Sequence, residues 1–336
     1  MKQETQMFCG DSAVELLKIR DNSVDMLCSD PPYGYSFMNK GWDQVLPDTE
    51  IWRQSYRVLK PGAFITVMAA PRTDVLWRIS RDLEEAGFDL SFTNIEWVYH
   101  SGFPKATDVS KSLDKRLGGE REVVGESNRH GGGTSAMYPY EVNNPITVAS
   151  TDVAKKYEGS KAGFQPKPAR EIIIVGMKPF SEGSYVDKVL NFEALPDNVK
   201  MTYPLIQTPK PAKKEKDFGL SGEEQKKPQR DEGQEKFNVP QKNRPTTAKN
   251  IHPTVKPIKL MSYLITLFTR PGDWVLDPFG GSGTTGLACK LLDRNHIYID
   301  FTEEYYDIAQ ERLQVSKEDL KKLLKEKISN GQQELF

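Results

Sequence analysis

The chain has 336 residues, enough for one large or two smaller domains, and its 46 basic and 47 acidic residues give a formal net charge of −1. This balance excludes a protein that coats nucleic acid with a uniformly basic surface, so any DNA-binding surface must be a local patch. The three cysteines form no CxxC pair, and with only four scattered histidines the sequence predicts neither a disulfide framework nor a metal site. Residues 1–6 are polar and lack the apolar core of a signal peptide, and no apolar run approaches membrane-spanning length. We therefore expect a soluble, cytoplasmic protein with no membrane partner.

Residues 8–100 alternate between predicted helices and predicted strands. Helices are expected at 12–19, 50–59 and 75–86, and strands at 24–29, 64–68 and 92–99. Apolar strands separated by helices are typical of a parallel sheet with helices on its faces.

The alternation stops after residue 100 and returns at 251. Residues 101–168 are rich in Gly, Ser, Asn and Pro and predict irregular structure, whereas 171–176 predict one more strand. Residues 210–249 hold 11 basic and 7 acidic residues and few large apolar ones, which predicts an exposed insert. A solvated linker and a phosphate-binding arm fit this insert equally well.

The last part of the chain again predicts α/β structure. Helices are expected at 257–268, 284–292, 303–313 and 316–327, and strands at 274–276 and 296–299. The final helix opens with a capping-box pattern, Ser316-x-x-Asp319. Each α/β stretch is too small for a doubly wound sheet, and together they fit one sheet that is interrupted by inserts.

The predicted strand at 24–29 is followed directly by the motif Asp30-Pro31-Pro32-Tyr33. This motif suggests a rigid binding pocket. The Asp30 carboxylate and the Pro31 carbonyl can both accept hydrogen bonds from one amino group, and proline restrains the backbone there. Tyr33 can stack on the face of a planar ring. The motif therefore predicts a site for a flat heterocycle that bears an amino group. An ordinary turn is the alternative, because Asp and Pro are common in turns.

A second motif, at 274–285, reads as a strand, a glycine-rich turn and a helix. Its glycines let a ligand approach the backbone, and the start of the helix offers N–H groups. The spacing Gly281-x-Gly283-x-x-Gly286, with Asp300 about twenty residues further on, also fits a dinucleotide site. However, Asp277 at the strand end would repel a pyrophosphate and suits the ammonium group of a ligand without phosphate.

The two motifs, Asp30-Pro31-Pro32-Tyr33 and Asp277-Pro278-Phe279-x-Gly281-x-Gly283, resemble those of the amino-group DNA methyltransferases, which use S-adenosylmethionine. Because the first motif precedes the second, the sequence resembles the permuted β-group of that family. The resemblance covers residues 8–105, 165–180 and 250–315. It implies a doubly wound, mostly parallel, seven-stranded Rossmann-like α/β sheet with an inserted recognition region.

The resemblance also implies a function, which is site-specific methylation of N6 of adenine in a base flipped out of double-stranded DNA. In this family Asp rather than Ser before Pro-Pro-Tyr favours adenine, and N4 of cytosine is the alternative. A nicotinamide-dependent oxidoreductase and a non-catalytic DNA-binding protein are more distant alternatives. A restriction–modification setting in a bacterium, an archaeon or a phage is expected.

Site residues are carried over from the family's motifs. The catalytic residues implied are Asp30, Pro31, Pro32 and Tyr33. The cofactor-binding residues implied are Asp11, Thr254, Lys256, Asp277, Phe279, Gly281, Gly283, Thr284, Thr285 and Asp300. Asp11 fits a helix N-cap nearly as well, and the stretch 252–257 fits an ordinary helix start. The strand end Tyr298-Ile299-Asp300 departs from the family's usual Gly-x-Glu, which puts the detailed ribose contact in doubt.

Contacts to DNA are expected from Phe37 and Lys40, in the loop after the catalytic motif, and from Arg129 and His130, in a glycine-rich loop. Packing within its own loop is the alternative role for Phe37. The last five residues, Gln332 to Phe336, resemble peptides that dock on bacterial sliding clamps, and a homodimer is a further partner to consider.

The expected division of the chain follows from these motifs. It comprises a catalytic half at 1–105, an irregular insert at 106–168, a returning strand of the catalytic half at 169–180, a target-recognition region with the charged insert at 181–250, a cofactor-binding half at 251–315, and a C-terminal helix and tail at 316–336.

Overall fold

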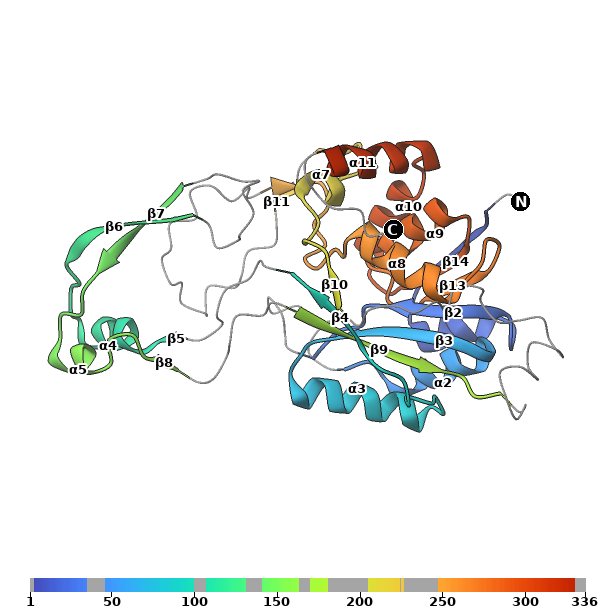
Figure 1. Cartoon of the computed structure of the whole chain (residues 1–336), viewed down its shortest axis with the longest axis horizontal. Coiled ribbons are helices and arrows are strands. Elements are labelled where there is room, and N and C mark those ends of the chain that lie inside the picture. Colours follow the sequence, from blue (N-terminus) through green and yellow to red (C-terminus); the bar gives the residue numbers. More distant parts are fainter. Residues whose placement is uncertain are drawn as a thin grey trace. The chain divides into compact units, whose positions relative to one another are not determined.

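The chain forms two compact units in the computed structural model (Figure 1). The first, called here the α/β unit, comprises Met1–Val98, Arg170–Asp231 and Pro245–Phe336, and the second, called the insert unit, comprises Tyr99–Ala169 and Glu232–Arg244. The structure describes residues 3–34, 46–99, 107–130, 141–162, 170–180, 205–223, 225–226 and 247–329.

One eight-stranded sheet forms the centre of the α/β unit. In their order across the sheet, the strands are β1 (Thr5–Cys9), β14 (Asn295–Asp300), β13 (Trp274–Asp277), β2 (Val24–Ser29), β3 (Leu59–Ala69), β9 (Arg170–Met177), β4 (Ile95–Val98) and β10 (Leu205–Gln207). Strand β9 is antiparallel to both β3 and β4, and every other neighbouring pair is parallel. The predicted mostly parallel, doubly wound α/β sheet is confirmed. It has one strand more than the seven expected, because the short β10 pairs beside β4.

Helices cover both faces of this sheet. In chain order they are α1 (Ser12–Glu15) with the 3₁₀ turn η1 (Leu16–Lys18), α2 (Thr49–Val58), α3 (Thr73–Glu85), α8 (Ile258–Phe268), α9 (Thr284–Leu292), α10 (Glu303–Arg312) and α11 (Lys317–Ser329). Helices α2 and α3 lie on one face, and α8 and α9 lie on the other (Figure 1). Each was predicted within a few residues of these bounds. The capping box before α11 is confirmed, since the Ser316 hydroxyl accepts a hydrogen bond from the Asp319 N–H at 3.1 Å.

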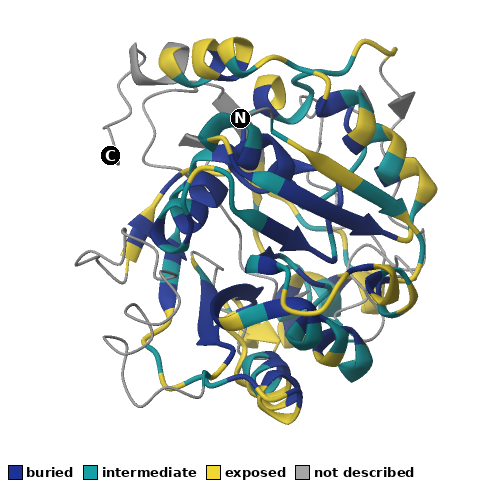
Figure 2. Ribbon diagram, turned by 90° about the vertical axis from the view of Figure 1, so that its right-hand side faces the viewer, coloured by how far each residue is buried: buried dark blue, intermediate teal, exposed yellow. Residues whose placement is uncertain are grey.

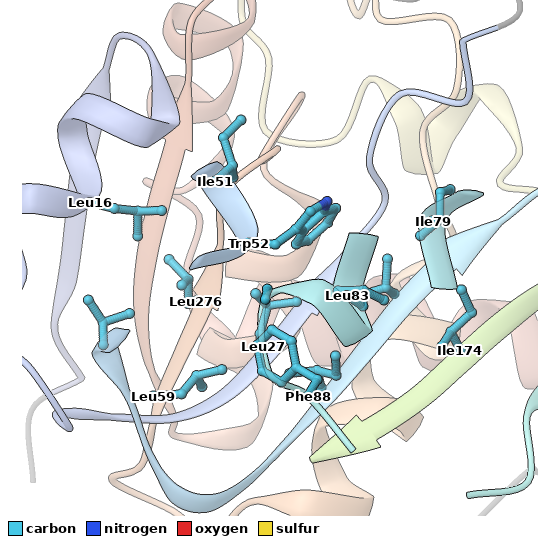
Figure 3. Packing of buried hydrophobic residues seen from close by; sticks show 14 of the residues in the cluster. Leu16, Leu27, Ile51, Trp52, Leu59, Ile79, Leu83, Phe88, Ile174 and Leu276 are labelled. Carbon is cyan, nitrogen blue, oxygen red and sulfur yellow. The ribbon is translucent and has the colours of Figure 1, made fainter. Parts of the chain in front are cut away.

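The apolar core on the α2–α3 face follows from the two-residue period of the strands. Leu27 of β2, Leu276 of β13 and Ile174 of β9 pack there with Trp52 of α2 and Leu83 of α3 (Figure 3). All five side chains are at most 2% exposed. Burying an apolar side chain of this size stabilises the fold by roughly 1.5–3 kcal/mol. The strands therefore form a buried layer between helices that keep one side exposed (Figure 2).

Strand β1, strand β10 and the start of strand β3 were not predicted. Strand β1 was missed because it lies at the edge of the sheet, where its residues are exposed or half-buried and show no apolar run. Strand β3 begins at Leu59, directly after α2, rather than at 64. Lys60-Pro61-Gly62, between the predicted helix and the predicted strand, therefore belong to this strand, in which Gly62 has a positive φ of 78°.

The insert unit contains regular structure that the sequence did not predict. Its described elements are β5 (Thr107–Asp108), α4 (Val109–Leu117), β6 (Val123–His130), β7 (Glu141–Thr147), α5 (Asp152–Lys156) and β8 (Lys161–Ala162). The prediction that 106–168 is irregular is therefore wrong for these stretches. Its buried groups are partly polar, since the Asp114 carboxylate is 1% exposed and accepts hydrogen bonds from Arg121 and Thr151, both at 2.7 Å. Apolar periodicity, on which the prediction relied, is weak in such a unit.

Part of the charged insert packs on the α/β unit rather than standing in solvent. Helix α7 (Lys213–Lys216) buries Glu215, whose carboxylate accepts a hydrogen bond from the Ile258 N–H at 2.8 Å and so caps the start of α8. The buried Arg312 donates to the Glu215 carbonyl at 3.3 Å and to the Ser282 carbonyl at 2.5 Å. The prediction of an exposed insert over 210–249 is therefore corrected for its first residues, which hold the helix α8 and the turn before α9.

His296 of β14 is fully buried, and among the described residues neither ring nitrogen has a hydrogen-bond partner. Burial lowers the pKa of His296 to about 3, from an ordinary value of 6.5. As the pH falls, His296 therefore takes up a proton in the unfolded chain before it does so in the folded protein. The free energy of unfolding is unaffected by this histidine above pH 6.5 and decreases progressively between pH 6.5 and pH 3.

We expect this histidine to destabilise the protein at pH 5 by about 2 kcal/mol relative to pH 7, at 1.36 kcal/mol per pH unit. Thermal unfolding of the protein and of His296→Leu at both pH values measures the effect, and the variant should lose this part of the pH dependence. An identical pH dependence in the two proteins would contradict the prediction.

No helix in the described part of the chain has both the length and the apolar character needed to cross a membrane. Within the same residues, no group of His, Cys, Asp and Glu side chains is arranged to hold a metal ion.

Candidate active site

Several carboxylates lie along the side of the sheet at which the parallel strands have their carboxyl ends. Asp30 follows β2, Asp277 ends β13 and Asp300 ends β14. Because β13 lies between β14 and β2, these three acids come from adjacent strands. Glu171 of β9 joins them, since β9 is antiparallel and its first residues lie where the parallel strands end.

Asp30 lies in a cluster of charged and polar side chains. Its Oδ2 atom forms an ion pair with Lys256, which stands just before α8, and its Oδ1 atom accepts a hydrogen bond from the Tyr33 hydroxyl at 2.8 Å. The same hydroxyl lies 3.2 Å from Glu171 Oε2, and the Lys256 ammonium lies 3.6 Å from that atom. Two carboxylates therefore share one ammonium and one hydroxyl. Pro31 is buried and Pro32 half-buried, so the whole motif is held in the edge of the sheet.

The electrostatics of this cluster follow from burial. Desolvation raises the pKa of Asp30, and the Lys256 ammonium acts in the opposite direction. The pKa of Tyr33 is raised well above its ordinary value by burial and by the two carboxylates, so the hydroxyl stays protonated and acts as a donor. The ammonium of Lys256 lies 5.9 Å from the centre of the Tyr33 ring, so one face of the ring is near a cation.

Asp277 joins the two halves of the site. Its Oδ1 atom accepts hydrogen bonds from the Ser29 hydroxyl at 2.6 Å and from the Phe279 N–H at 3.2 Å, and its Oδ2 atom accepts one from the Thr285 hydroxyl at 2.5 Å. Burial raises the pKa of Asp277 to about 6. The carboxylate thus ties the end of β2, beside Asp30, to the glycine-rich turn and to the first turn of α9.

The glycine-rich turn is fixed by side chains from β14. The Tyr298 hydroxyl donates to the Gly281 carbonyl at 2.7 Å, and the Gly281 N–H donates to Asp300 Oδ2 at 2.8 Å. Gly281 and Gly283 have positive φ angles of 50° and 79°, which L side chains rarely adopt. A Cβ atom on Gly280 would lie 2.2 Å from the ring of the buried Tyr298. The departure from Gly-x-Glu therefore places a tyrosine directly under the turn.

The other predicted cofactor residues surround this turn. Asp11 is the N-cap of α1, where it accepts from the Ala13 N–H at 2.8 Å, and the next residue, Ser12, donates to the Pro278 carbonyl at 2.6 Å. Thr284 is 7% exposed at the start of α9. The half-buried Phe279 packs against Trp52, with ring centres 5.6 Å apart.

The segment before α8 approaches both parts of the site. His252 stands beside the turn, since a Cβ atom on Gly281 would lie 2.7 Å from its Nε2 atom, and the Thr254 N–H donates to its Nδ1 atom at 3.4 Å. Lys256 was predicted as a cofactor contact, and that assignment stays a prediction. In the structure its ammonium pairs with Asp30 and lies near Glu171.

The sequence did not single out Glu171, Ser29 or Tyr298 as site residues. The available signal for Glu171 was a carboxylate directly before the apolar run of a strand, but its position depends on the antiparallel direction of β9, which spacing alone does not give. Among the predicted DNA contacts, Phe37 and Lys40 lie outside the described residues. The backbone of Arg129 and His130 ends β6, and their side chains lie outside the description, as do the residues Gln332 to Phe336.

The fold and this site define a class of protein. A doubly wound sheet that carries Asp-Pro-Pro-Tyr after one central strand and an acid with a glycine-rich turn after the next has the arrangement expected of an amino-methyltransferase. The chain belongs to the DNA methylase family of N6 and N4 methyltransferases, whose sequence profile matches residues 24–311. The predicted resemblance is thereby confirmed, together with S-adenosylmethionine as the cofactor of the family.

Individual relatives are type II methyltransferases. M2.DpnII of Streptococcus pneumoniae is 49% identical over 67 residues, which are 20% of this chain and 25% of that protein. M2.MboI of Moraxella bovis is 46% identical over 77 residues, 23% of this chain and 28% of that protein. The chain thus matches only about a quarter of the length of these two relatives. M.HpaI of Haemophilus parainfluenzae is 25% identical over 322 residues, 92% of this chain and 74% of that protein.

A solved structure agrees with the fold. The PvuII DNA methyltransferase, described as cytosine-N4-specific, superposes with a TM-score of 0.51 at 18% identity and covers 99% of this chain and 95% of its own. At this level of identity the likeness concerns the fold alone.

Proposed function

We propose that the protein is a site-specific DNA methyltransferase that transfers a methyl group from S-adenosylmethionine to the exocyclic N6 nitrogen of an adenine flipped out of double-stranded DNA. The observation that carries this proposal is the position of Asp30. It is a half-buried carboxylate directly after β2, and the preceding residue, Ser29, donates to Asp277 beside the glycine-rich turn.

The residues of the turn suit this cofactor. When bound, S-adenosylmethionine supplies a methyl group activated by a positively charged sulfur. It carries an ammonium group and ribose hydroxyls but no phosphate, so the acids Asp277 and Asp300 suit it and would disfavour a pyrophosphate. Each oxygen of a carboxylate can accept more than one hydrogen bond, so Asp300 retains capacity for ribose hydroxyls beside its bonds to Gly281 and Thr302.

The catalytic motif would hold the target amino group. Its lone pair is delocalised into the base, which makes it a weak nucleophile. Hydrogen bonds from its two N–H groups to Asp30 and to the Pro31 carbonyl would favour a pyramidal nitrogen with a more localised lone pair. The step then depends mainly on positioning. Lys256 lies near one face of Tyr33, so a flipped base would stack on the other face.

The choice of adenine rests on Asp30 itself, because Asp before Pro-Pro-Tyr favours N6 of adenine in this family, and N4 of cytosine remains the alternative. Double-stranded DNA as the partner is part of the proposal. So are the DNA contacts by Phe37, Lys40, Arg129 and His130, the target-recognition region at 181–250, and the homodimer and sliding-clamp partners.

Mass spectrometry of nucleosides tests the proposal. DNA of varied sequence, prepared from a host without DNA methyltransferases, is incubated with the protein and S-adenosylmethionine, and in parallel with Asp30→Ala. We expect N6-methyladenine with the unmutated protein only. N4-methylcytosine would retain the reaction and overturn the choice of base, whereas no methylated nucleoside at all would reject the proposed function.

A further inference from the structure

Glu171 is a second carboxylate in the catalytic pocket, and neither motif contains it. It is the second residue of β9, and its side chain is 12% exposed, close to the 18% of Asp30 and the 8% of Lys256. Its Oε2 atom lies within 3.6 Å of both groups that hold Asp30, the Tyr33 hydroxyl and the Lys256 ammonium. The two acids therefore compete for the same donors.

Each oxygen of Asp30 already has one partner. Tyr33 donates to Oδ1 and Lys256 pairs with Oδ2, so an amino group that approaches Asp30 must share or replace one of them. Displacing a buried ammonium with no other partner is strongly unfavourable, because it leaves an uncompensated buried charge. Lys256 avoids this cost only if a second carboxylate stands within reach, and Glu171 does.

We propose that Glu171 is a positioning residue that receives the Lys256 ammonium when the target amino group binds Asp30. In the base-free pocket, Lys256 pairs with Asp30 Oδ2. When the amino group arrives, the ammonium moves from Asp30 Oδ2 to Glu171 Oε2 and frees an oxygen of Asp30 to accept from the base. The kinetic part of this inference rests on the proposed function, and the electrostatic part does not.

The charges that act on Asp30 make the inference measurable. Lys256 favours the ionised form of Asp30, and Glu171 disfavours it. The other titratable groups that face Asp30 are Tyr33, which donates to it, Asp277 on β13 and Cys28 on β2. Of these groups, Tyr33 also contacts Glu171, and it remains a protonated donor to Asp30 when Glu171 becomes neutral. The two substitutions should therefore move the pKa of Asp30 in opposite directions.

Carbon-13 NMR of the full chain, labelled at the aspartate carboxyl carbons and without ligand, measures this pKa. The signal of Asp30 is identified by its absence in Asp30→Asn. We expect Glu171→Gln to lower the pKa of Asp30 by about one unit and Lys256→Gln to raise it by about one unit, because the first removes a like charge and the second an opposite charge. Lys256→Arg keeps the cation and should leave the pKa near that of the unmutated protein.

An unchanged pKa of Asp30 in Glu171→Gln would overturn the inference. If Lys256→Gln does not fold, the comparison between Glu171→Gln and the unmutated protein is sufficient for the test. Thermal unfolding of each variant shows whether it is folded. Since no turnover is involved, this outcome is independent of whether the protein methylates DNA.

Single-turnover methylation then tests the movement of Lys256. With unmethylated genomic DNA and saturating S-adenosylmethionine, we expect Glu171→Gln to react about tenfold more slowly, which corresponds to 1.36 kcal/mol. The acidic limb of its pH–rate profile should move to lower pH, while its affinity for S-adenosylmethionine stays the same. An unmutated protein that methylates DNA, beside a Glu171→Gln variant with the same rate and pH profile, would reject the inference and leave the proposed function standing.

Discussion

Asp30→Asn is expected to slow methyl transfer by about a hundredfold to ten-thousandfold, the range typical of a positioned side chain that accepts a proton. The substitution keeps the shape of the side chain but removes its charge, and a carboxylate accepts hydrogen bonds about twice as strongly as a neutral group. The methylated amino nitrogen also loses its nearest proton acceptor. Binding of S-adenosylmethionine should change little, because Asp277 and Asp300 hold the glycine-rich turn independently of Asp30.

Single-turnover kinetics measure this loss, and calorimetry measures the affinity for S-adenosylmethionine. A matched control is Asp21→Asn, which removes the same charge at a side chain that is 65% exposed and pairs with Arg57 on the surface. The control should react at the rate of the unmutated protein. Equal losses in both variants would show that net charge, rather than the Asp30 carboxylate, governs the reaction.

Gly280→Ala is expected to damage the cofactor site and the fold together. The added Cβ atom would lie 2.2 Å from two carbon atoms of the Tyr298 ring. That ring is fully buried and its hydroxyl is bonded to the Gly281 carbonyl, so it has no open direction in which to move. Overpacking of this kind costs about 1–3 kcal/mol. Displacement of the turn should also weaken binding of S-adenosylmethionine by about tenfold, which corresponds to 1.4 kcal/mol.

Thermal unfolding and calorimetric titration with S-adenosylmethionine measure both effects. The control is Gly222→Ala, because a Cβ atom at Gly222 meets nothing within 4 Å. Combining Gly280→Ala with Tyr298→Leu should recover part of the lost stability, since the two positions are in contact and their effects are not additive. Unchanged unfolding and binding in Gly280→Ala would show that the turn adapts without cost.

The sequence predicted the α/β unit well because its signals are local. The buried strands β2 and β13 are short apolar runs, and the helices α8 and α9 begin next to Pro and Gly, respectively. Both motifs stand where a strand passes into a loop or a helix, so their position at one edge of the sheet followed from the parallel arrangement. The domain boundaries, the site assignments and the DNA contacts stay predictions.

The features that were not predicted depend on contacts between segments that are distant in the sequence. Strand β1 is recognisable only through its partner β14, and Glu171 enters the pocket only because β9 runs against its neighbours. Glu215 reads as one charge among many, whereas in the structure it caps α8 from a position 43 residues earlier in the chain. The insert unit was missed because carboxylate and guanidinium groups such as Asp114 and Arg121 occupy positions where an apolar pattern would have revealed a helix or a strand.

The strand order also constrains how the protein can be synthesised and folded. Strand β1 has β14 as its one neighbour in the sheet, and the apolar β2 lies between β3 and β13. Neither strand can complete its pairing until residues 274–300 have been synthesised. Until then β2 presents an unpaired, water-avoiding edge on which another chain can add. Contacts so distant in sequence form slowly. The sheet can therefore be completed only after residues 274–300 are available, and a chain truncated before residue 274 would leave this edge of β2 open to aggregation.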